Sequence, residues 1–146
     1  MSNQRVTASE ALALQRIGYT IVDLRPPFDF NRGHPAGAHN VPFYFYTDAG
    51  GVRDNPDFLA AISSIFPKDA KLVVLDKLGT RSPRAVEALL AAGYRDVRDV
   101  LGGYKGLADA QGRRDGGWEP AGLPYTLTNE AGYAELLAES TKKPKG

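Results

Sequence analysis

The chain has 146 residues, of which 42% are hydrophobic and 24% charged, so it suits one globular domain and is too short for two separate cores. Eighteen Lys and Arg residues against seventeen Asp and Glu give a formal charge of +1. This balance provides no overall positive charge that would attract nucleic acid. The sequence has no cysteine, which excludes disulfides, thiolate metal ligands and a thiol nucleophile. The sequence has no apolar run long enough to cross a membrane, and its first residues lack the charged and apolar regions of a signal peptide. We therefore expect a soluble intracellular protein without a membrane span. Its location would be the cytoplasm or, after removal of a transit peptide, an organelle stroma or matrix.

Hydrophobic periodicity and turn residues predict the elements of the first third of the chain. Thr7 and Glu10 form a capping-box pattern, so a helix is expected at about 8–17. The apolar, β-branched run at 20–24 is typical of a buried strand. Residues 25–55 are rich in Pro and Gly, and we expect a long irregular stretch there with one short strand.

The middle of the chain predicts a strand, a tight loop, a helix and a second strand. Asn55-Pro56 and Ser82-Pro83 each have the pattern of an N-cap followed by the first residue of a helix. The run KLVVL at 71–75 is typical of a strand covered on both faces, and the next strand lies within 94–101. In such a unit the ligand site lies at the carboxyl end of the first strand. The candidate site is therefore the loop 76–81.

Toward the C-terminus the pattern weakens. One short amphipathic helix is expected at 131–137, followed by a mobile basic tail at 141–146. The whole chain is therefore expected to be a single domain with a core at about 7–125 and a C-terminal extension at 126–146.

The chemistry of the loop favours a negative group. Backbone N–H groups at a helix N-terminus and the helix dipole attract anions, and Arg81 adds a permanent positive charge. Because these groups favour an ionised carboxylate, the pKa of Asp76 is expected to be lowered. The residues of this loop are Asp76, Lys77, Leu78, Gly79, Thr80 and Arg81.

Two long motifs resemble the signatures of rhodanese-like domains. Residues 21–43, IVDLRPPFDFNRGHPAGAHNVPF, are similar to the family's first signature, which runs Asp-x-Arg, Gly-His-x-x-Gly-Ala and Asn-x-Pro. Residues 72–103 are similar to the second signature, which has an apolar strand, Cys-x4-Arg-Ser, a helix, a strand and Gly-Gly. The resemblance implies a single α/β domain with a mostly parallel sheet of about five strands and helices on both faces. An insertion near 111–118 departs from the family pattern.

The resemblance also implies that Asp76 stands where the family carries its catalytic Cys, which accepts sulfur as a persulfide. A carboxylate has no sulfur to load, and the chain contains no other thiol. We interpret Asp76 as an inactive residue at the catalytic position and as a permanent anionic mimic of the loaded Cys. Asp23 and Arg25 are interpreted as a structural charge pair, and His34 as support for the fold.

Three functions stay open at this stage. The first is a non-catalytic rhodanese-like domain that acts as a binding or regulatory module for an unidentified protein, with a small anion as a further candidate ligand and with no cofactor or metal. The second is an Asp76-dependent hydrolase or phosphotransferase, since DKLGT resembles the DKTGT motif of P-type ATPases. The third is a sulfurtransferase whose catalytic Cys was replaced by Asp76 through engineering. The aromatic run 44–46 is either core cover or an exposed docking patch.

Overall fold

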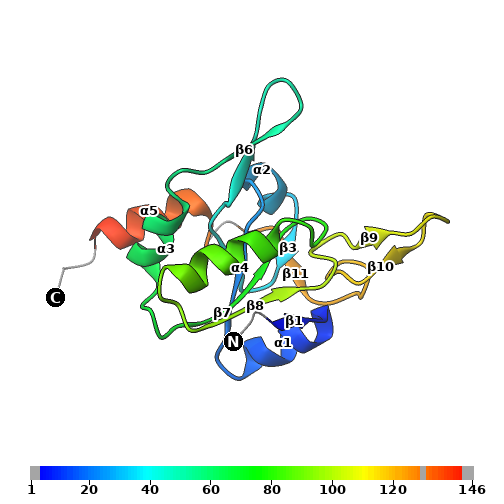
Figure 1. Ribbon diagram of the computed structural model, residues 1–146, viewed down its shortest axis with the longest axis horizontal. Helices are drawn as coiled ribbons and strands as arrows, with labels where there is room; N and C mark the ends of the chain where they lie inside the picture. Colours follow the sequence, from blue (N-terminus) through cyan, green and yellow to red (C-terminus); the bar gives the residue numbers. More distant parts are fainter. Residues whose placement is uncertain (1–3, 129–130, 143–146) are drawn as a thin grey trace.

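The computed structural model describes residues 4–128 and 131–142. Its centre is a five-stranded sheet between two layers of helices (Figure 1). The helices and strands are, in chain order, β1 (Gln4–Val6), α1 (Ala8–Arg16), β2 (Thr20–Asp23), α2 (Pro27–Phe30), β3 (His34–Pro35), β4 (His39–Asn40), β5 (Tyr44–Tyr46), β6 (Val52–Asp54), α3 (Phe58–Ile65), β7 (Lys71–Leu75), α4 (Ser82–Ala91), β8 (Asp96–Val100), β9 (Leu107–Ala108), β10 (Arg114–Asp115), β11 (Tyr125–Thr126) and α5 (Tyr133–Lys142).

The central sheet has the strand order β1-β8-β7-β2-β4, and all four neighbouring pairs are parallel. This confirms the expected parallel sheet of about five strands. Successive side chains of a strand point to opposite faces, so the apolar run of β7 supplies both sides of the sheet. Val74 packs into one apolar cluster, whereas Val73 and Leu75 pack into the other.

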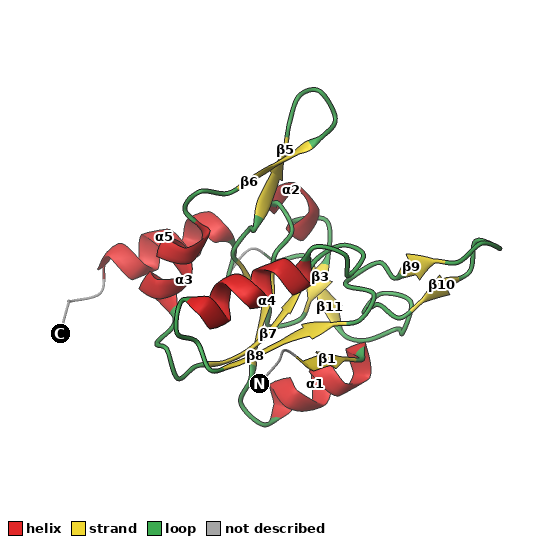
Figure 2. Ribbon diagram, in the orientation of Figure 1, coloured by secondary structure: helices red, strands yellow, loops and turns green. Residues whose placement is uncertain are grey.

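Each face of the sheet carries its own apolar cluster. One cluster lies between the sheet and α3, α4 and α5, and includes Ile62 and Leu89. The other lies beneath α1 and contains Trp118, which is fully buried. Figure 2 shows α1 on the side of the sheet opposite to α4. The prediction of helices on both faces is therefore confirmed.

Several elements differ from the sequence-based expectation. The stretch 25–55 is not irregular throughout, because it contains α2, β3, β4 and the β5–β6 hairpin. Ser82 is the first residue of α4 and not its N-cap, since its hydroxyl donates to Asp99 instead of accepting from the helix. Asn55 accepts from the N–H of Asp57, so it caps the turn before α3, and that helix begins at Phe58.

The C-terminal helix docks on the core. Tyr133, Leu136 and Leu137 of α5 pack against the cluster under α3, and the N–H of Asn40 donates to Ala131. The helix is longer than the expected 131–137, and residues 143–146 of the expected tail lie outside the described residues. Among the helices described, none has the length and apolarity needed to cross a membrane.

The turn after β8 packs backbone to backbone against the loop after β7. The N–H groups of Tyr104 and Lys105 donate to the carbonyls of Asp76 and Lys77, both at 2.8 Å. A Cβ on Gly103, which has φ +62°, would lie 2.4 Å from the carbonyl oxygen of Asp76. Only glycine therefore allows this close approach, which fixes the position of the loop.

We predict that Gly103→Ala loses more stability than Gly122→Ala. Both positions have positive φ, at +62° and +71°, so both variants carry the left-handed cost of about 1–2 kcal/mol. Nothing lies within 4 Å of a Cβ on Gly122, whereas the one on Gly103 clashes with backbone and should cost about 1–3 kcal/mol more. Urea unfolding of the two variants measures the difference, and equal losses would contradict the close contact.

Candidate functional site

The loop between β7 and α4 closes around the carboxylate of Asp76. This side chain is 1% exposed and follows the last residue of β7. One oxygen, Oδ1, accepts from the N–H of Gly79. The other, Oδ2, accepts from the N–H groups of Arg81 at 2.6 Å and Ser82 at 3.1 Å. The carboxylate thus occupies the anion cradle that the sequence predicts and satisfies N–H groups at the start of α4.

The local sequence explains this arrangement. The N-cap position of α4 is Arg81, whose side chain makes no capping hydrogen bond, so the first N–H groups need an acceptor from elsewhere. Gly79 has φ +86°, and its ideal Cβ would lie 2.7 Å from the backbone nitrogen of Gly102. Glycine at this position lets the loop turn back far enough to bring its N–H groups onto Asp76.

A polar network lies below the loop. Asp99 of β8 is fully buried, and its Oδ2 accepts from the hydroxyl of Ser82 at 2.8 Å and from Nε of Arg5 at 3.1 Å. Arg5, from β1, also donates to the carbonyl of Gly79 at 2.6 Å. The sequence analysis missed Arg5 and Asp99. A charged residue two positions after Val97, where the alternation of a strand predicts an apolar side chain, was the signal that could have indicated Asp99.

Asp23 and Arg25 form the predicted charge pair at the end of β2. Nε and Nη2 of Arg25 donate to the two carboxylate oxygens at 3.0 and 2.8 Å, and both side chains are buried. Nη2 also donates to Gly33, and the guanidinium lies 4.1 Å from the ring centre of Tyr104. The pair therefore links the segment around Gly33 to the turn after β8, which contacts the loop.

His34 faces the core and not the loop. Its ring stacks on Phe30 with the ring centres 3.5 Å apart, and Nδ1 donates to the carbonyl of Phe30 at 2.7 Å. Burial lowers the pKa of His34, which favours the neutral ring. This placement agrees with a structural role.

Comparison with known proteins identifies the family. A family model described as a rhodanese-like domain matches residues 7–110. The chain belongs to the rhodanese-like domain family. It is 40% identical over 107 residues to Thiosulfate sulfurtransferase 16, chloroplastic, from Arabidopsis thaliana, which covers 73% of this chain and 87% of the relative.

Two further similarities support this assignment. The chain is 42% identical over 94 residues to Senescence-associated protein DIN1 from Raphanus sativus, which covers 64% of this chain and 51% of the relative. The chain thus spans about half the length of that protein. The crystal structure of Rv0390 from M. tuberculosis superposes with a TM-score of 0.73 at 25% identity, covering 88% of this chain and 100% of the other.

In this rhodanese-like domain the expectation of a lowered pKa for Asp76 is wrong. Burial raises the pKa of Asp76, and the N–H groups of Arg81, Gly79 and Ser82 oppose this effect without reversing it. The guanidinium of Arg81 does not offset burial, because it lies 4.9 Å from the ring centre of Tyr44 and forms no ion pair with Asp76. The backbone N–H of Arg81 therefore binds the carboxylate, whereas its guanidinium does not.

The aromatic run divides between core and surface. Tyr44 is buried, and burial raises its pKa. Tyr46 is 41% exposed and donates its hydroxyl to Asp29, and burial raises its pKa to about 12. The run therefore combines core cover at Tyr44 with an exposed edge at Tyr46.

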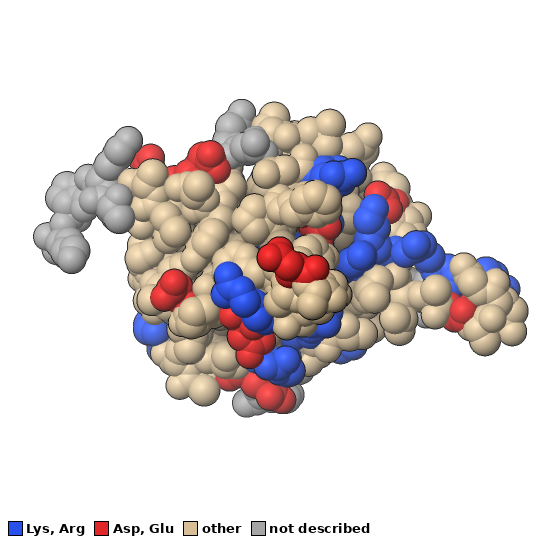
Figure 3. All heavy atoms as spheres, turned by 90° about the horizontal axis from the view of Figure 1, so that it is seen from above, with Lys and Arg blue, Asp and Glu red and all other residues tan. Residues whose placement is uncertain are grey.

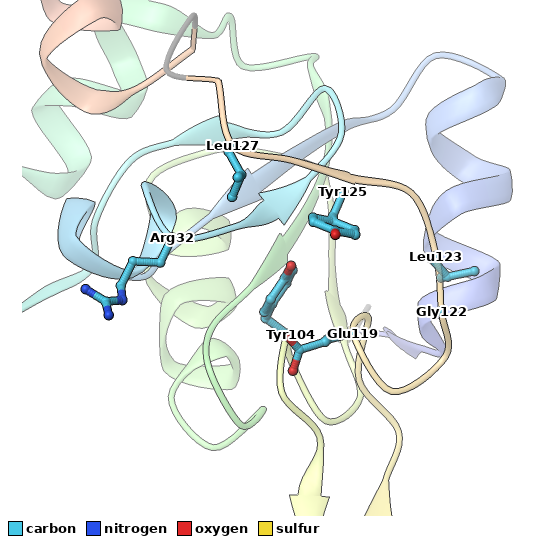
Figure 4. Close-up of a pocket in the computed structure, with 7 residues that line it drawn as sticks. All are labelled: Arg32, Tyr104, Glu119, Gly122, Leu123, Tyr125 and Leu127. Atoms are coloured by element: carbon cyan, nitrogen blue, oxygen red, sulfur yellow. The ribbon is translucent and has the colours of Figure 1, made fainter.

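Three hollows surround the rhodanese-like loop and the turn behind it. One of about 470 Å³ lies behind Tyr104, whose hydroxyl points toward the space between Arg32 and Tyr125 (Figure 4). Two others, of about 570 and 260 Å³, flank Leu78 on the outer side of the loop. Within residues 4–128 and 131–142, no cluster of three His, Cys, Asp or Glu side chains could hold a metal ion.

The raised pKa predicts how stability depends on pH. The folded state binds the Asp76 proton more tightly than the unfolded state, so this contribution to stability is fully present below the ordinary carboxyl pKa. It is lost as the pH rises through the raised folded-state pKa. Relative to Asp76→Asn, which cannot titrate, the parent should therefore lose stability as the pH rises above the ordinary carboxyl pKa of about 4.

Urea unfolding of parent and Asp76→Asn at several pH values measures this difference. Subtracting the variant cancels the titration of the other carboxylates, which both proteins share. A parent that gains stability over the variant with rising pH would show that the three N–H groups outweigh burial.

Proposed function

We propose that this rhodanese-like domain is non-catalytic and acts as a binding or regulatory module through the loop 76–81 and its rim. One observation carries the proposal: a carboxylate fills the loop and takes the N–H groups of Gly79, Arg81 and Ser82, in a chain without cysteine. The partner in this proposal is a protein.

The chemistry of sulfur transfer supports the non-catalytic proposal. The family resemblance places a nucleophilic Cys at the position of Asp76, and its thiolate must attack a sulfur donor and carry the sulfur as a persulfide. A carboxylate cannot hold a transferable sulfane sulfur. Its oxygens instead extend into the cradle, where they accept the hydrogen bonds that a loaded Cys would otherwise receive.

The buried carboxylate also argues against an aspartyl phosphotransferase. A nucleophilic Asp must present one oxygen to the incoming phosphoryl group. Here both oxygens of Asp76 accept hydrogen bonds, and the side chain is 1% exposed. A phosphate found on Asp76 by mass spectrometry, after incubation with acetyl phosphate and Mg²⁺, would favour this alternative.

The other residues of the site have proposed roles in support and in binding. Lys77 and Thr80 are exposed on the rim, and Leu78 is half-buried beside them. Asp23, Arg25 and His34 are proposed as structural support because all three are buried and hydrogen-bonded within the fold.

We predict that the parent shows no thiosulfate:cyanide sulfurtransferase activity above the rate without protein. Asp76→Cys should gain measurable turnover, because it restores a sulfur nucleophile at the position where the N–H groups of the cradle favour the thiolate form. Asp76→Ser, which has nearly the same shape but no sulfur, is the matched control and should stay inactive. The assay measures thiocyanate formation from the three proteins.

Turnover by the parent would contradict the non-catalytic proposal. A folded Asp76→Cys variant that takes up no sulfur would show instead that the pocket around the cradle has also diverged.

A second prediction concerns free anions. Asp76 already uses the cradle donors, so the parent should bind sulfate weakly, whereas Asp76→Ala leaves the same N–H groups open. The variant should bind sulfate at least about tenfold more tightly, the scale of one charge-assisted hydrogen bond. NMR titration measures both affinities, with chloride matching the ionic strength.

A circular dichroism spectrum of the variant controls for folding. Equal or tighter sulfate binding by the parent would show that Asp76 leaves the cradle in solution.

A further inference from the structure

A hollow of about 570 Å³ lies on the outer side of the loop, between the loop and the β9–β10 hairpin. The hairpin projects from the domain at the right of Figure 1. Lys77 and Leu78 of the loop form one wall, and Leu107, Ala108 and Arg114 of the hairpin form another. We call this hollow the hairpin cleft; Lys105, Gly106 and Glu119 complete its lining.

Positive charge converges on the hairpin cleft from three separate segments. Lys77 comes from the loop, Lys105 from the turn after β8, and Arg114 from the hairpin. Glu119 also lines the cleft and pairs with Lys105 at 3.0 Å. The whole chain has a formal charge of only +1, so this excess is a local feature. Figure 3 shows Lys and Arg side chains gathered beside the projecting hairpin and extending onto it.

Two of these cations are available to a ligand. Lys77 is exposed, and no ion pair found in the described residues includes it. Nη1 of Arg114 donates to the carbonyl of Lys105 at 2.9 Å, which holds the guanidinium at the cleft without neutralising it. A carbonyl has no net charge, so the positive charge of Arg114 remains available to an anion.

The hairpin cleft also has an apolar side. Leu107 is 49% exposed and lines the cleft together with the half-buried Leu78. A second hollow of about 260 Å³ shares Leu78, Leu107 and Ala108 with the cleft and adds Leu101, which is 43% exposed. Leucine side chains that line two adjoining hollows can bury an apolar side chain of a partner.

We propose that the hairpin cleft binds an acidic segment of a partner protein, with one apolar side chain seated between Leu78 and Leu107. Carboxylates on both sides of that anchor would face Lys77 and Arg114. Charge complementarity favours an acidic ligand. The apolar side of the cleft favours a peptide over a simple anion. This inference rests on the proposed binding function and names the chemistry of its partner.

The cleft lies partly outside the family match. The rhodanese-like model ends at residue 110, within the β9–β10 hairpin, so Arg114 and Glu119 lie beyond it. The insertion noted near 111–118 therefore contributes Arg114 to the hairpin wall of the site. The loop supplies the other wall, which couples the cleft to the segment that carries Asp76.

The test uses a synthetic peptide of about ten residues, roughly 30 Å when extended, with Glu and Asp on both sides of a central Leu. Fluorescence anisotropy measures its affinity for the full chain. The double variant Lys77→Gln/Arg114→Gln should bind roughly fivefold more weakly or worse, since each exposed charge pair contributes modestly. The control variant Arg16→Gln/Arg95→Gln also removes two exposed charges. These residues precede the amino ends of β2 and β8, whereas the cleft lies beyond the carboxyl ends of the strands. The control variant should therefore bind the peptide as tightly as the parent.

Peptide variants test the two halves of the proposal. Replacing the acidic residues by Gln and Asn should abolish binding, and replacing the central Leu by Ser should weaken it. Raising the salt concentration from about 0.05 M to about 0.5 M should weaken binding of the acidic peptide through screening.

Three results would overturn the proposal. They are equal losses in the cleft and control variants, no binding of the acidic peptide by the parent, and tighter binding of a thymidine oligonucleotide of equal length. Sulfurtransferase turnover, measured without peptide, would contradict the proposed function instead. The two failures are therefore distinguishable.

Discussion

One buried carboxylate organises the end of the sheet where the candidate site lies. The side chain of Asp76 accepts three N–H groups from its own loop and from the start of α4, while its backbone carbonyl accepts the N–H of Tyr104. A single residue thus joins β7, α4 and the turn after β8. Because α4 has no capping side chain of its own at Arg81, removing this acceptor would leave buried donors unsatisfied. The shape of the loop depends on that constraint.

The charge pair of Asp23 and Arg25 contacts the same turn after β8 that contacts this loop. Arg25 is held by Asp23 and packs over the ring of Tyr104, the residue whose N–H binds Asp76. Burying two charges is unfavourable unless their hydrogen bonds are well made, and here the pair is bidentate with a further bond to Gly33. Several hydrogen bonds and a ring contact therefore hold Arg25 in one position beside the loop. A support that is held in place in this way suits a surface that recognises a partner in one fixed shape.

The sequence predicts the parts of the fold that depend on local pattern. The apolar run of β7 and the helix that begins near Ser82 are visible from neighbouring residues alone, as is the anion-binding geometry of the loop between them. β1 was not predicted, because it has only three residues and exists through its pairing with β8. The β5–β6 hairpin was not predicted either, because the Pro and Gly residues of its segment are typical of an irregular loop.

The electrostatics of the site followed the same division. The nearby N–H groups and Arg81 could be inferred from sequence, and they favoured an ionised Asp76. The opposing effect, burial at 1% exposure, arises only when distant segments pack around the loop. The guanidinium of Arg81 lies over the ring of Tyr44, which belongs to a hairpin that the sequence analysis did not predict. Long-range packing therefore reversed the direction of the expected pKa shift.

The position of Trp118 gives the molecule an internal optical reporter. It is the only tryptophan in the sequence, it is fully buried, and its indole N–H donates to Pro124. Its backbone N–H donates to the carbonyl of Gly103, which lies directly against the backbone of Asp76. Intrinsic tryptophan fluorescence, excited near the red edge of absorption where tyrosine does not absorb, therefore arises from one site a single hydrogen bond away from the turn that holds the loop. A rearrangement of that turn would change the emission without any attached dye.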